Sequence, residues 1–115
     1  MADTIVDRTV FEDLKATAGA DFVKDLVDTF LIEAPVMMED LRSSLAANDA
    51  ERFRRAAHSL KSNSNTFGAL TLAAMAKDLE LGGLGPARAA GVTPLDALEV
   101  EYTRVAKALM ELKRA

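Results

Sequence analysis

The stretch AAHSLKSNSNTFGAL, residues 56–70, decides the fold of this chain, because it reads either as a polar linker or as a helix. It is rich in Ser, Asn and Thr, which are poorer helix formers than Ala by only about 0.5 kcal/mol each. Beginning at Phe53, apolar and small residues recur at helical spacing and lie within about 100° of arc on a helical wheel. They are Phe53, Ala56, Ala57, Leu60, Ser64 and Phe67. A linker has no reason to keep this spacing, so we predict a helix.

Two further helices are predicted upstream of this one. Apolar residues recur at spacings of three and four in a short segment, Asp7–Thr17, and in a long one, Asp21–Ala47. Pro35 lies inside the long segment, where it removes a backbone donor and is expected to kink the helix. Because the apolar stripe resumes on the same side after it, we predict one kinked helix. Asn48 or Asp49 then caps the helix that contains residues 56–67.

Two helices are predicted downstream. The first covers Ala69–Leu81, and the segment GGLGPARAAG (residues 82–91) that follows it is predicted to be the longest loop. Thr93 is expected to cap the last helix, with Pro94 in its first turn and an apolar stripe running to Leu112. Four long helices with mostly short connections predict an all-α fold. Its expected form is an antiparallel up-and-down four-helix bundle with an additional short N-terminal helix packed across it.

Length and composition narrow the class of protein. The chain has 115 residues, enough for one compact domain, which we expect to span residues 1–115. It has no Cys, which excludes disulfides and thiolate metal sites, and its net charge of −4 argues against nucleic-acid binding. The acidic start lacks a signal peptide and no apolar run is long enough to span a membrane, so we expect a cytoplasmic location. Met1 and a complete final helix favour a free-standing protein.

His58 is the only histidine, and it lies roughly 140° from the middle of the apolar arc on the helical wheel. The ring is therefore expected to face solvent. Lys61 follows one turn later, Ser62 and Asn65 are small enough to leave the ring accessible, and three arginines in residues 52–55 make the surroundings basic. These features fit an accessible nucleophile beside an anion-stabilising lysine. On the residues alone, an ordinary surface histidine stays open.

Ser64 and Gly68 have structural interpretations. Ser64 falls on the apolar stripe, where its hydroxyl is expected to bond back to the carbonyl of Leu60. Both residues are small enough to let the next helix approach closely. Packing is therefore the favoured role of each.

Several kinds of chemistry are excluded or disfavoured. The chain has no P-loop and no second domain that could bind a nucleotide, and its clustered glycines lack the G-x-G-x-x-G spacing. One His without Cys disfavours a metal site. A helical bundle offers no strained turn for a triad serine.

The segment AAHSLKSNSNTFGALTLAAMAKDLELGG resembles the signature of histidine-containing phosphotransfer (HPt) domains of two-component phosphorelays. That signature reads approximately A-H-x-L-K-G/S-x-S-x-x-x-G-A/L, followed by a helix with L-x-x-x-x-x-x-L-E. The matching residues are Ala57, His58, Leu60, Lys61, Ser64, Gly68, Ala69, Leu72, Leu79 and Glu80. Ser62 departs from the glycine of many members, although serine also occurs there. The resemblance covers roughly residues 20–84.

The resemblance implies a stoichiometric phosphoryl carrier, not an enzyme. His58 would accept the phosphoryl group from a receiver-domain aspartyl phosphate and pass it to another response-regulator receiver. Lys61 would steady the phosphate charge, and Glu80 would orient the imidazole through Nδ1–H. The implied partners are receiver domains and a hybrid sensor histidine kinase, without nucleic acid or membrane. No cofactor of its own is implied, because the receiver supplies Mg²⁺.

The surface that a receiver would contact includes the residues around His58. The candidates for docking are Arg54, Arg55, Ser62, Asn65 and Gly68. The alternative function, from a different class, is a non-enzymatic adaptor bundle that binds partner proteins, in which the histidine has no role.

Overall fold

A computed structural model describes residues 5–114, and every secondary-structure element in this part of the chain is helical. The six helices are α1 (Arg8–Ala18), α2 (Ala20–Ala47), α3 (Ala50–Thr66), α4 (Leu70–Gly82), α5 (Leu84–Ala90) and α6 (Thr93–Arg114). The predicted all-α class is confirmed. The boundaries of α1 to α4 agree with the predicted segments to within a few residues.

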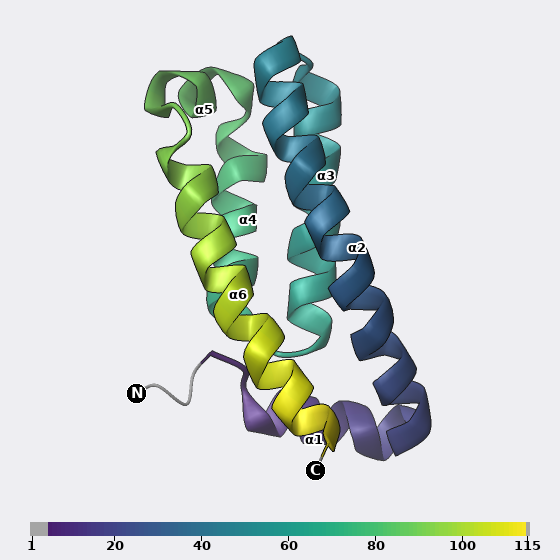
Figure 1. The fold of residues 1–115 in the computed structure, drawn as a ribbon. Helices are drawn as coiled ribbons and strands as arrows, with labels where there is room; N and C mark the ends of the chain where they lie inside the picture. The colour runs from purple at the N-terminus through teal and green to yellow at the C-terminus, as the bar shows by residue number, and fades with distance from the viewer. Residues whose placement is uncertain (1–4, 115) are drawn as a thin grey trace.

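The four long helices α2, α3, α4 and α6 lie side by side (Figure 1). The α2 helix packs on α3 and α6, and α4 packs on the same two helices from the other side. The α1 helix crosses the end of the molecule where α6 finishes, as Figure 1 shows. The short helix α5 lies at the opposite end and contacts all four long helices. The two ends of the long helices are thus each covered by a short helix.

The α5 helix corrects the prediction that residues 82–91 form a loop and that the N-terminal helix is the only addition. Gly83 and Gly91 bracket α5 with positive φ angles of 78° and 76°, so these two glycines separate helices and do not fill a loop. Proline is tolerated within the first turn of a helix, where Pro86 lies. Leu84 and Ala87 are buried, and this burial favours the helix.

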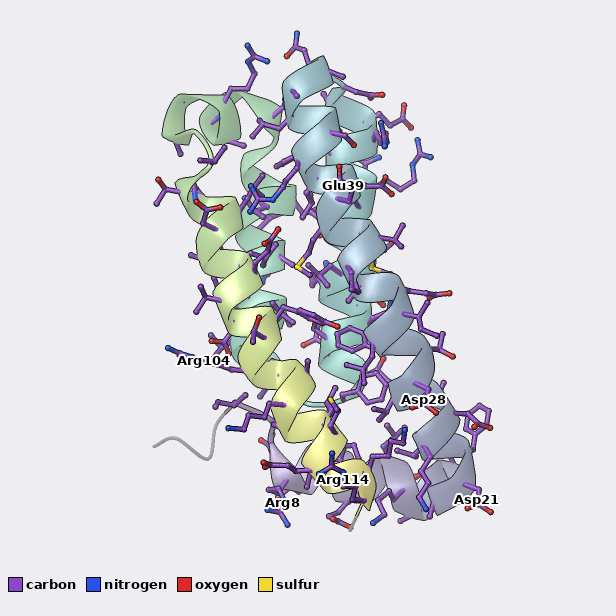
Figure 2. The ribbon with its side chains drawn as sticks, viewed as in Figure 1. Arg8, Asp21, Asp28, Glu39, Arg104 and Arg114 are labelled. Carbon is purple, nitrogen blue, oxygen red and sulfur yellow. The ribbon has the colours of Figure 1, made fainter. Side chains whose placement is uncertain are left out.

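The residues that predicted α3 are in the core. Phe53, Ala56, Ala57, Leu60, Ser64 and Phe67 are all buried. Phe67 packs against Phe30 of α2 with ring centroids 5.3 Å apart, and the ring centroid of Tyr102 of α6 lies 6.0 Å from that of Phe30. Figure 2 shows the charged side chains of Asp21 and Arg104 projecting away from the bundle, whereas Glu101 of α6 is buried.

The connections around α2, α3 and α6 show which capping predictions hold. Asp49 caps α3 by accepting a hydrogen bond from the backbone N–H of Arg52 at 3.1 Å, while Asn48 ends α2 in the left-handed conformation. The cap predicted at Thr93 is wrong, because α6 begins at Thr93 itself. The N–H of Asp96 donates to the carbonyl of Val92 at 2.9 Å, so the residue that precedes the helix is Val92 and not the predicted Thr93.

The prediction for Ser64 is wrong in one respect. Its side chain is fully buried, but the hydroxyl makes no hydrogen bond to Leu60 or to any other residue in the described range 5–114. Ser44 of α2 makes the predicted kind of bond instead, with Oγ donating to the carbonyl of Asp40 at 2.6 Å. A small side chain at Ser64 therefore serves the close packing of α3.

Candidate functional site

His58 lies in the middle of α3 on the side away from the core. Its neighbours Ala57 and Leu60 are fully buried, whereas 57% of the His58 side chain is exposed. This position follows from the phase of the apolar stripe, which turns Ala57 inward and the next residue outward. The imidazole is anchored by a rigid helix and open to solvent.

Glu80 reaches the imidazole from the neighbouring helix α4. Its Oε2 lies 2.8 Å from Nδ1 of His58, and only 14% of its side chain is exposed. Since a carboxylate only accepts hydrogen bonds, Nδ1 carries the proton and donates it in this contact. The other ring nitrogen, Nε2, then presents its lone pair on the exposed side of the ring.

Lys61 completes the group by contacting the second oxygen of the same carboxylate. Its Nζ lies 2.9 Å from Oε1 of Glu80, so one carboxylate bridges a lysine and a histidine. Hydrogen bonding with Lys61, and then with His58, holds the pKa of Glu80 below its ordinary value of 4.5, against the effect of desolvation. The sequence placed all three residues at the site but did not predict the pair between Lys61 and Glu80.

A family model described as "Hpt domain" matches residues 25–113 of this chain. The chain belongs to the Hpt domain family. It is also similar to the crystal structure of histidine-containing phosphotransfer protein B (HptB) from Pseudomonas aeruginosa PAO1, with 27% sequence identity and a TM-score of 0.81. That similarity covers 96% of this chain and 95% of the other. A search of curated proteins finds no match.

Membership of this family assigns a histidine phosphotransfer role in a two-component phosphorelay. Hpt domains carry phosphoryl groups and work with receiver domains and kinases. His58 is the only histidine of this Hpt domain, and its exposed ring suits that role.

The predicted docking residues of the Hpt domain divide into two groups. Arg54, Arg55, Ser62 and Asn65 are all exposed on α3 around His58. Gly68 is buried in the turn after α3, where its carbonyl accepts a hydrogen bond from the backbone N–H of Asp7 at 2.8 Å. Because Gly68 is buried, it stabilises the turn and is not part of the exposed surface around His58.

A groove between α2 and α3 opens beside this surface. Its volume is about 250 Å³, and its lining comprises Met37, Asp40, Arg52, Arg55, Ala56 and Ser59. Arg52 and Asp40 form an ion pair across it at 2.8 Å. Ser59 directly follows His58 in α3, so the groove opens next to His58.

Residues 5–114 contain neither a cluster of metal ligands nor a helix suited to span a membrane. No three or more His, Asp or Glu side chains in this range gather in a way that could hold a metal ion. Within the same range, no helix combines the length and apolarity needed to cross a membrane.

Proposed function

We propose that His58 accepts a phosphoryl group on Nε2 from a receiver-domain aspartyl phosphate and passes it to the receiver of another response regulator. The observation that carries this proposal is the exposed imidazole whose Nδ1 is held by Glu80 at 2.8 Å. That hydrogen bond leaves Nε2 as the nucleophilic nitrogen and keeps the ring in one orientation. A hybrid sensor histidine kinase is the proposed source of the phosphoryl group.

The transfer requires positioning and charge neutralisation more than covalent chemistry by this chain. The lone pair of Nε2 forms the N–P bond while the bond between phosphorus and the partner's aspartate oxygen breaks, and the electron pair leaves with the carboxylate. The proton on Nδ1 stays in place. We propose that Lys61, which lies one turn from His58 and contacts Glu80, neutralises the transferred oxygens. We propose that the receiver supplies the Mg²⁺ that assists this step.

The chain acts as a stoichiometric carrier in this proposal. Each molecule holds one phosphoryl group, on its single histidine, and returns to its starting state when the group leaves. The N–P bond keeps a high transfer potential, which suits a reversible relay. We place this activity in the cytoplasm, where receiver domains work.

The test is incubation with a phosphorylated receiver. The chain is expected to acquire label that is stable in alkali and labile in acid, and His58→Gln is expected to abolish it. Lys107→Gln, at an exposed position of α6 outside the predicted docking residues, serves as a control that should still be labelled. Failure of the wild-type chain to accept label, or label persisting in His58→Gln, would contradict the carrier function. A chain that binds receivers without accepting label would be the adaptor.

Lys61→Ala tests the second assignment. Loss of the ammonium is expected to slow transfer or shorten the lifetime of the phosphohistidine, with the far-UV circular dichroism of the helices unchanged. Unchanged kinetics and lifetime would make Lys61 a residue of the surface only.

A further inference from the structure

A small pocket lies at the end of the molecule where α1, the beginning of α2 and the end of α6 meet (Figure 1). Its apolar lining includes Phe11 of α1 together with Val23 and Val27 of α2, which are all buried. The volume of the pocket is about 70 Å³, roughly twice the volume of a water molecule in the liquid, so it has room for one short aliphatic group. Every lining residue belongs to α1, α2 or α6, and the pocket is therefore separate from the site at His58.

Three lysines, one from each of these helices, line the same pocket. They are Lys15, Lys24 and Lys113. Lys15 lies 3.9 Å from Glu12 and Lys113 pairs with Asp28, but neither carboxylate is among the lining residues. Lys24 is exposed and takes part in none of the ion pairs within residues 5–114. The charge that faces the pocket is therefore positive, in a chain whose net charge is −4.

Helix stability accounts for two of these lysines and not for the third. Lys15 lies in the last turn of α1 and Lys113 in the last turn of α6, where the helix dipole favours a cation. Lys24 follows the first turn of α2, near the positive end of that helix, where a cation gains nothing from the dipole. Three cations that face one pocket also repel each other in the free protein, and an anionic ligand removes this repulsion.

The size of the pocket decides between a small acid and a peptide as the ligand. An acid that fits about 70 Å³ has few non-hydrogen atoms, and their number limits the binding free energy of a small ligand. A peptide inserts one side chain and also places the carboxylates of neighbouring residues against lysines on three helices. We propose that this pocket binds an acidic segment of a partner protein, with one aliphatic side chain inserted and the flanking carboxylates paired with the three lysines. Binding there leaves His58 open to a receiver.

The test is a titration of the ¹⁵N-labelled protein with the peptide acetyl-EELEE-amide, followed by the amide chemical shifts. Saturable shifts are expected around the pocket, including those of Ala20, Val23 and Lys24, and the affinity should fall as salt is added. Replacing the leucine of the peptide by alanine should weaken binding about tenfold, because the aliphatic group is then no longer buried. The small acid 4-methylpentanoate, which carries the same aliphatic group, should bind about tenfold more weakly than the peptide.

A matched pair of variants locates the site. Lys24→Glu reverses the lysine that the helix dipole does not explain and should weaken peptide binding about fivefold. Lys77→Glu makes the same change in net charge at an exposed position of α4, which does not line the pocket, and should leave the affinity nearly unchanged.

Several outcomes would overturn the proposal. They are the absence of saturable shifts, equal weakening by the two variants, shifts centred on Arg54 and Arg55, and an affinity that does not depend on the leucine of the peptide. Binding of 4-methylpentanoate as tight as that of the peptide would also overturn it, because the pocket would then be a site for small acids. None of these measurements involves phosphorylation of His58, so the proposal and the carrier function are tested independently.

Discussion

The single carboxylate of Glu80 joins α3 to α4, and its charge makes that junction sensitive to pH. Lys61 and His58 hold the pKa of Glu80 below 4.5, so its ionised form is favoured in the folded state. A group with a lowered pKa stabilises the fold above its unfolded pKa, and this contribution is lost as pH falls through the folded value. We therefore expect Glu80→Gln to lower the free energy of unfolding at neutral pH, and the deficit to shrink below pH 4.5. Urea unfolding across this range checks it; a deficit that is constant with pH would contradict it.

Gly68 is a second residue whose identity has a defined physical reason. It has a φ of +81°, and a Cβ there would lie 2.9 Å from both the carbonyl oxygen of Asp7 and Cβ of Val10. Gly68→Ala is expected to lower the free energy of unfolding by about 2–4 kcal/mol, from backbone strain together with overpacking. The matched control is Gly85→Ala, because no atom lies within 4 Å of that Cβ and Gly85 is helical. That change should be neutral or stabilising; equal losses in both variants would refute the role of the turn.

How far single residues could be predicted depends on the range of the contact. The exposure of His58 follows from the phase of one helix, which periodicity reveals. The Lys61–Glu80 ion pair joins two helices. No local sequence pattern determines the position of one helix relative to the other along their axes. Gly68 likewise contacts Asp7, which lies far earlier in the sequence, at the start of α1. Sequence reasoning therefore found the residues of the site but missed this pair.

Among the helices, α5 shows why composition misled the prediction. Gly and Pro usually mark loops, and residues 82–91 contain four glycines and a proline. In the structure these residues lie at helix boundaries or within the first turn, where they are tolerated, and the helix between them is held by contacts with all four long helices. Arg88 adds one such contact by donating to the carbonyl of Leu45 at 3.2 Å. Tertiary contacts of this kind have no local sequence signal.

The α2 helix passes through Pro35 without ending, as predicted, and α6 compensates for the missing donor. Proline at this position leaves the carbonyl of Leu31, four residues earlier, without its helical partner. The hydroxyl of Tyr102, the only tyrosine, donates to that carbonyl at 3.4 Å. Burial also raises the pKa of Tyr102, consistent with its place between two helices.

This compensation predicts coupling between Pro35 and Tyr102. Tyr102→Phe should cost about 0.5–1.5 kcal/mol of unfolding free energy in the wild type, because it leaves the Leu31 carbonyl unpaired. In a Pro35→Ala background, the restored backbone N–H can donate to the Leu31 carbonyl, so the same change should cost much less. A double-mutant cycle measured by chemical denaturation gives the coupling energy. Additive effects of the two changes would show that Tyr102 does not replace the missing donor.

The distribution of charge over the whole molecule favours one side for an anionic partner. The net charge is −4, yet Arg54, Arg55 and Lys61 lie around His58, and an aspartyl phosphate on a receiver is an anion. Opposed charges speed encounter in a way that salt screens. The second-order rate constant of phosphotransfer with a receiver is therefore expected to fall several-fold as ionic strength rises from about 0.05 to 0.5 M.

Two double variants test whether the residues around His58 cause this salt dependence. Charge reversal of Arg54 and Arg55 to Glu should slow transfer about tenfold at low salt and flatten the salt dependence, since steering raises association rates by about 10-fold or more. Reversal of Arg104 and Lys107 on α6 makes the same change in net charge on exposed residues of another helix, and should have little effect. Rapid-quench measurement of transfer to one receiver gives both rates. Equal slowing by the two pairs would mean that net charge alone governs the encounter, and the surface around His58 would then have no special part in docking.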